Sequence, residues 1–167
     1  MNTAVTVFFL IIKVFSLYFL AVSLFGLCSR RRPEPAARLR RLAVLIAARN
    51  EESCIAGLIE SLRAQHYPPE LVDIWVLPNN CTDRTAEAAR RAGAQVLEMP
   101  ASVRSKGAAL HTAAKALLRS ARNYDAFCVF DADNEADPAF LSEMNRALDR
   151  TAIVKSRILA KNRTQAG

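Results

Sequence analysis

The strongest constraint on the fold is a regular alternation of strand-like and helix-like segments from residue 41 to residue 150. Short apolar runs between polar turns are typical of buried strands, whereas apolar residues spaced by three and four are typical of one helix face. The predicted strands are 41–48, 73–78, 94–99 and 126–130, and the predicted helices are 51–65, 82–94, 105–121 and 138–150. This order predicts an α/β fold with a doubly wound, mainly parallel sheet, which binds ligands at the carboxyl ends of its strands.

Helix ends and one further strand can also be predicted. Thr82 is the expected N-cap of the second helix, and Gly93 is its expected stop. Asp137, directly before Pro138, is the expected cap of the fourth helix. The run 151–158 is a candidate for one more strand.

Residues 4–28 form an apolar run that contains a single charge, Lys13. As a helix with a rise of about 1.5 Å per residue it reaches roughly 37 Å, and the hydrocarbon core of a bilayer is about 30 Å thick. A cleaved signal peptide is the main alternative. However, no Lys or Arg precedes Lys13, and Leu27 before Cys28 is too large for a lipoprotein cleavage site. We therefore expect one retained transmembrane helix.

The net charge of +7 is concentrated in residues 29–41, which contain six arginines and one glutamate. Residues 42–167 are nearly neutral, which excludes the basic face that a nucleic-acid-binding domain needs. Arginines beside a membrane span stay on the cytoplasmic side and attract anionic lipid. We therefore expect a single-pass protein of the cell inner (plasma) membrane, in contact with membrane lipid, with a 4–28 anchor, a 29–41 basic linker and a cytoplasmic 42–167 domain. A solvated linker is compatible with both roles of the arginines.

The four cysteines lie far apart and form no C-x-x-C pair. This spacing argues against a zinc site and against a disulfide framework. We expect them to be reduced and to act as small apolar side chains.

Polar residues follow the predicted strands at the edge where this architecture binds ligands. Free backbone N–H groups at a helix start accept anions, a pair of amides can recognise a nucleobase edge, and a Lys-Gly pair can contact a phosphate. Helix capping explains each segment equally well when it is taken alone. No G-x-x-x-x-G-K-[ST] loop and no clear Ser-His-Asp set is present. The candidate ligand-binding residues in these turns are Arg49, Asn50, Glu51, Asn79 and Lys106.

The sharpest local signal is an Asp-x-Asp motif that directly follows the fourth predicted strand. Alternate residues of an extended segment face the same way, so Asp131 and Asp133 can converge on one cation. Unpaired carboxylates this close repel one another, and Mg²⁺ or Mn²⁺ removes that cost. The alternative is an acidic, solvated loop. A solvated loop does not explain why the Asp-x-Asp motif stands at the end of a buried strand.

Taken together and in order, four segments resemble the family 2 glycosyltransferases, which have the GT-A fold, and in particular their membrane-anchored bacterial members. The segments are VLIAARNEE, NNCTDRTAEAARRAGA, KGAAL and FDADNEADPAFL, within roughly residues 42–145. The resemblance implies a Rossmann-like nucleotide-sugar-binding half. It also implies sugar transfer with inversion from a nucleotide-sugar donor, often a UDP-sugar, to a polysaccharide or lipid-linked acceptor. Mn²⁺ or Mg²⁺ would support the leaving diphosphate.

The resemblance also implies which residues contact the nucleoside. It puts Arg49, Asn50 and Glu51 near that part of the donor. Asn79 stands where the family usually has an aspartate that reads the uracil edge. An amide can accept a hydrogen bond as a carboxylate does, but its N–H donor can change the choice of base.

At the diphosphate, the resemblance implies contact with Lys106. It puts Asp131 near the ribose, the sugar and the metal, and Asp133 at the metal. The family's catalytic base is a carboxylate downstream of the Asp-x-Asp motif, and residues 134–167 contain no E-D pair that could supply it. We therefore expect a donor-binding half that is truncated after this motif, without the acceptor half and without the base that the chemistry needs.

Two other functions stay open from the sequence. The first is a catalytically inactive remnant, or a donor-binding module, tethered to the membrane. The second is a nucleotidyltransferase, which also uses a doubly wound sheet and an aspartate-held metal. That chemistry would want a glycine-rich triphosphate loop after the first strand, where Ala47, Ala48 and Arg49 stand instead.

Overall fold

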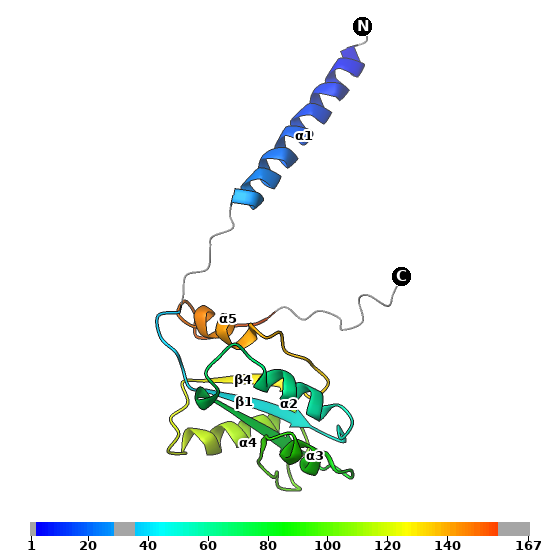
Figure 1. Ribbon diagram of the computed structural model, residues 1–167. Helices are drawn as coiled ribbons and strands as arrows, with labels where there is room; N and C mark the ends of the chain where they lie inside the picture. Colours follow the sequence, from blue (N-terminus) through cyan, green and yellow to red (C-terminus); the bar gives the residue numbers. More distant parts are fainter. Residues whose placement is uncertain (1–2, 29–35, 157–167) are drawn as a thin grey trace. The chain divides into compact units, whose positions relative to one another are not determined.

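The computed structural model describes residues 3–28 and 36–156 of the chain (Figure 1). It divides into two compact units, Met1–Pro35 and Ala36–Gly167. The first unit contains the helix α1 (Thr3–Cys28). Its segment Val5–Leu24 is long and apolar enough to cross a membrane, a test that signal sequences near an N-terminus also pass.

The second unit is built on a four-stranded parallel sheet, as the alternation predicts. Its strands are β1 (Leu42–Ala48), β2 (Val72–Pro78), β3 (Gln95–Val96) and β4 (Ala126–Asp131). Their spatial order is β3-β2-β1-β4, with every neighbouring pair parallel. The central strand β1 is almost wholly buried because it has a strand on each side and helices on both faces.

The helices lie on both faces of the sheet, which confirms the doubly wound fold (Figure 1). Residues of α2 (Ile55–Arg63), α3 (Thr85–Arg91) and α5 (Phe140–Ala147) pack on the side of Val44 and Ile46. On the other side, α4 (Lys106–Leu118) packs against Ala43 and Leu45. Consecutive side chains of a strand point to opposite faces, so β1 supplies both layers of the core. A short 3₁₀ helix, η1 (Pro69–Leu71), precedes β2.

Two local predictions are wrong. The side chain expected to cap α3, Thr82, does not do so, because the carboxylate of Asp83 accepts the backbone N–H of Thr85 instead, at 3.1 Å. The ionised carboxylate is the stronger acceptor at the positive end of a helix. No strand forms over 151–156, the described part of the candidate run 151–158, where Ile153 is exposed; residues 157–158 lie outside the described residues.

Gly93 follows α3 as predicted, whereas Asp137 bonds in the turn that leads into α5, which has Ala139 as its N-cap and no side-chain cap. Gly93 has φ +91 and ends the turn after α3, a conformation that suits glycine. The carboxylate of Asp137 accepts the N–H of Ala139 at 2.8 Å, just before α5. Cys54, Cys81 and Cys128 are free thiols, and the fourth cysteine lies where side chains are not described.

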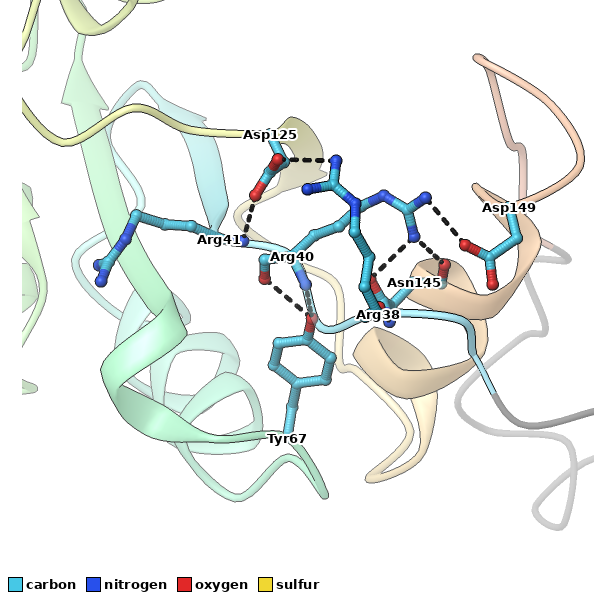
Figure 2. Close-up of polar contacts among 7 residues, drawn as sticks. All are labelled: Arg38, Arg40, Arg41, Tyr67, Asp125, Asn145 and Asp149. Carbon is cyan, nitrogen blue, oxygen red and sulfur yellow. Dashed lines mark hydrogen bonds and ion pairs between the residues drawn. The ribbon is translucent and has the colours of Figure 1, made fainter.

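The segment that leads into β1 is held on the globular unit by a partly buried polar cluster (Figure 2). The guanidinium of Arg40 pairs with Asp149 at 2.8 Å and donates to the backbone oxygen of Asn145 at 3.0 Å. The hydroxyl of Tyr67 accepts the backbone N–H of Arg40 at 2.9 Å and donates to its carbonyl oxygen at 2.8 Å. Burial raises the pKa of Tyr67, so this phenol stays neutral.

Two further arginines of the predicted basic linker join this cluster. Arg38 pairs with Asp125 at 3.0 Å, and the backbone N–H of Arg41 donates to the same carboxylate at 2.8 Å (Figure 2). The side-chain amide of Asn145 donates to the carbonyl oxygen of Arg38 at 2.8 Å. Part of the linker's positive charge is therefore used in contacts with the globular unit.

Candidate functional site

The strand order creates a switch point between β1 and β4. From β1 the chain moves outward through β2 to β3, and then returns across the other face to place β4 on the opposite side of β1. In a doubly wound sheet, ligands bind at the carboxyl ends of the two strands where this reversal occurs. Ala47 lies opposite Asp131 in the register, so the turns after β1 and β4 begin side by side.

The turn after β1 carries three predicted site residues. Asn50 has φ +57, and its side-chain oxygen accepts the N–H of Thr82 at 2.8 Å. The N–H of Glu51 donates to the hydroxyl of Thr85 at 2.9 Å. These bonds join the turns after β1 and β2. Arg49 is exposed and makes no side-chain hydrogen bond or ion pair with the described part of the chain, so its guanidinium is free for a ligand.

The turn after β2 fixes the orientation of a nearly buried amide. Asn79 is 6% exposed, and its backbone N–H donates to the carbonyl of Ala48 at 2.9 Å. Its side-chain oxygen accepts from Nδ2 of Asn80 at 2.8 Å. The same Nδ2 donates to the carbonyl of Val103 at 2.7 Å, which determines the orientation of the Asn80 amide. Asn79 therefore keeps its side-chain N–H groups and one lone pair of its oxygen for a ligand.

The start of α4 meets the end of β4 through an ion pair. The ammonium of Lys106 contacts Oδ1 of Asp131, although the two residues are 25 positions apart. Their side chains are 47% and 58% exposed, so ligands can reach both. The hydroxyl of Ser105 caps α4 by accepting the N–H of Ala108 at 3.1 Å.

The Asp-x-Asp motif has the exposure pattern that a cation site needs. Asp131 and Asp133 are exposed, whereas Ala132 between them is 4% exposed. Within the described ranges no group of three or more His, Cys, Asp and Glu side chains could hold a metal by itself. The two carboxylates nevertheless fit Mg²⁺ or Mn²⁺, which complete their shells with phosphate oxygens and water. The Lys106 ammonium on Asp131 is a cation already bound at this carboxylate.

Cys54 lies beside the predicted site residue Glu51, although its sequence pattern predicted only a small apolar side chain. Its thiol donates to Oε2 of Glu51 at 2.9 Å. Burial, the hydrogen bond to Glu51 and the charges of Glu51 and Asp133 raise the pKa of this thiol to about 11. The thiol is therefore protonated at neutral pH. Cys54 follows Glu51 by three residues near a helix start, and this spacing could have predicted their contact.

Of the predicted site residues, the structure brings Lys106 and Asp131 into direct contact. Glu51 accepts a hydrogen bond from the thiol of Cys54, whose pKa the charge of Asp133 also raises. Positive charge on one side and exposed carboxylates on the other can bind an anion together with a divalent cation.

Comparison with known proteins shows the family of the chain. The family model described as "Glycosyl transferase family 2" matches residues 43–165. A Bacillus subtilis (strain 168) protein, "Probable glycosyltransferase YdaM", is 28% identical over 108 residues, which are 60% of this chain and 24% of that protein. The Staphylococcus aureus (strain NCTC 8325 / PS 47) "4,4'-diaponeurosporenoate glycosyltransferase" is 40% identical over 60 residues, which are 36% and 15% of the two chains.

A similar fold occurs in the mannosyltransferase PcManGT from Pyrobaculum calidifontis, solved in complex with GDP-Man and Mn²⁺. Its TM-score is 0.61 at 21% identity, over 82% of this chain and 42% of that one. The chain therefore spans less than half the length of these relatives. The family match covers well over half of the chain, which is therefore a member of glycosyl transferase family 2 with a GT-A-like fold.

Proposed function

We propose that this chain forms the donor-binding half of an enzyme that transfers a sugar from a UDP-sugar, with inversion, to a polysaccharide or lipid-linked acceptor. The observation that carries the proposal is the position of Asp131 and Asp133 at the switch point of a family 2 domain, with Lys106 beside them. Sugar transfer from a nucleotide-sugar needs a site that stabilises the nucleoside diphosphate as the leaving group.

In this proposal Asp131 and Asp133 hold Mn²⁺ or Mg²⁺. When bound, the ion neutralises the charge that develops on the leaving diphosphate. Lys106 adds a positive charge at the first residue of α4, where the backbone N–H groups of the helix also favour an anion. Two sources of positive charge would thus act on the same leaving group.

The nucleoside would lie against the turns after β1 and β2. Arg49 has a free guanidinium, and Asn50 and Glu51 are held by the bonds between these turns. Asn79 would donate its amide N–H to a carbonyl oxygen of the base, since one lone pair of its own oxygen is already taken by Asn80 and its N–H groups donate to no described residue. A uracil base offers two such oxygens.

The proposed location is the inner (plasma) membrane, with α1 as a single-pass anchor, the globular unit in the cytoplasm and membrane lipid as a partner. The apolar length of α1 and the arginines that follow it support this. An acceptor that is itself in or at the membrane would suit such an anchor. The general base is assigned to no residue of the described ranges.

Calorimetric titration of UDP into the full chain in detergent micelles, with and without Mn²⁺, tests the donor site. We expect binding that requires Mn²⁺ and that weakens at least tenfold in Asp133→Ala. Glu87→Ala, an exposed carboxylate on α3, is the matched control and should bind as the unmodified chain does. Binding that does not depend on Mn²⁺ or on Asp133 would contradict the proposal. Release of UDP from a UDP-sugar over time would distinguish a transferase from a module that only binds the donor.

A further inference from the structure

Lys106 occupies the carboxylate that the proposed function gives to the metal ion. Its ammonium contacts Oδ1 of Asp131. An ammonium and a divalent cation are both positive, and both would bind the same carboxylate. Two cations at one carboxylate repel each other, so the bound ammonium lowers the affinity of Asp131 for a divalent cation, by a modest factor at an exposed site. The ion pair is therefore a competitor of the metal.

We propose that Lys106 makes cation binding at Asp131 and Asp133 conditional on the diphosphate of the donor. Without nucleotide, the ammonium stays on Asp131 and weakens the binding of the cation. With nucleotide, the diphosphate attracts the ammonium away from Asp131 and leaves that carboxylate to the cation. This inference rests on the proposed function, since it takes the two aspartates as the cation ligands.

The surroundings of Lys106 allow this exchange. Its side chain is 47% exposed and that of Asp131 is 58% exposed, so neither is locked by packing. Lys106 is the first residue of α4, and an anion bound at this helix start would lie within the reach of its flexible stem. An ion pair with this exposure is weak, so a diphosphate with several negative charges can displace it.

Thermodynamic linkage gives the inference a measurable form. If the diphosphate removes a competitor of the cation, then nucleotide tightens cation binding, and the cation tightens nucleotide binding by the same factor. A lysine that only attracts phosphate would behave differently. Its removal would weaken nucleotide binding and would leave the affinity of the free protein for the cation unchanged.

The test is the affinity for Mn²⁺ alone, measured by the electron paramagnetic resonance signal of free Mn²⁺ with the full chain in detergent. The chains are the unmodified protein, Lys106→Met, which keeps the apolar stem, and the control Lys115→Met on the same helix. We expect Lys106→Met to bind Mn²⁺ about three- to tenfold more tightly than the unmodified chain. Lys115→Met should match the unmodified chain. In a parallel UDP titration with Mn²⁺, Lys106→Met should bind more weakly.

Two other results would each have a distinct meaning. Equal or weaker Mn²⁺ binding by Lys106→Met, in a chain whose UDP binding still depends on Mn²⁺ and Asp133, would overturn this inference and leave the proposed function intact. Failure of every variant to bind Mn²⁺, with or without UDP, would overturn both. Circular dichroism melting curves would show that each variant is folded.

Discussion

Replacement of Asn145 by alanine tests the polar cluster that holds the start of the globular unit. Asn145 is 1% exposed, and its side-chain amide donates to the carbonyl of Arg38 at 2.8 Å. Its side-chain oxygen also accepts from the Arg40 guanidinium at 3.3 Å. The substitution removes both bonds and leaves the carbonyl of Arg38 without this donor (Figure 2).

The expected loss follows from these two bonds. A neutral hydrogen bond contributes about 1 kcal/mol, and a bond to a charged group contributes about 1.5 kcal/mol or more. Arg40 keeps Asp149 and the backbone oxygen of Asn145, so we take the lower value for the long contact. We therefore expect Asn145→Ala to reduce the free energy of unfolding by about 2–3 kcal/mol.

Urea denaturation of the full chain in detergent micelles measures this free energy. Trp75, the single tryptophan, lies on β2 beside the core and reports unfolding by its fluorescence. Arg150→Ala, an exposed residue just beyond α5, is the control and should change the free energy by less than about 0.5 kcal/mol. A loss below about 0.5 kcal/mol in Asn145→Ala would refute the argument that this cluster stabilises the unit.

Three further predictions concern single residues. Asn79→Asp removes the N–H donor proposed for a carbonyl oxygen of the base, so the affinity for UDP should fall severalfold in titrations with Mn²⁺; an unchanged affinity would show that Asn79 does not contact the base. Gly93→Ala should cost about 1–2 kcal/mol in urea denaturation, because φ is +91 and a Cβ would meet the guanidinium of Arg63; unchanged stability would contradict this. Cys54, with a pKa of about 11, should react with iodoacetamide at pH 8 at least tenfold more slowly than a free thiol and should speed up as pH rises towards 11. Peptide mass spectrometry measures that rate, and a rate equal to that of free cysteine would contradict the assigned environment.

The parts of the fold that sequence reasoning predicts are those with a local pattern. The run 42–48 is apolar on every residue, as a strand with neighbours on both sides and helices on both faces must be. The spacing of Ile55, Leu58, Ile59 and Leu62 shows the buried face of α2 because a helix repeats every 3.6 residues. The Asp-x-Asp motif can also be found from the sequence, because both aspartates lie within three residues of one another at the end of a predicted strand.

The contacts that sequence reasoning did not predict join residues far apart in the chain. Six arginines beside an apolar helix look like a membrane-side linker, yet Arg40 pairs with Asp149, more than a hundred residues away. Lys106 and Asp131 are separated by α4 and a loop, and only the crossover between β3 and β4 brings them together. No local spacing contains this information.

The central claim is that Asp131 and Asp133 hold a divalent cation beside the diphosphate of a nucleotide. Anomalous diffraction at the manganese edge, from crystals of the chain grown with UDP and Mn²⁺, tests it most directly. The account predicts an anomalous peak in contact with both carboxylates and with the diphosphate, and Lys106 turned from Asp131 to the phosphates. A nucleotide bound elsewhere, or Mn²⁺ away from these two aspartates, would contradict it.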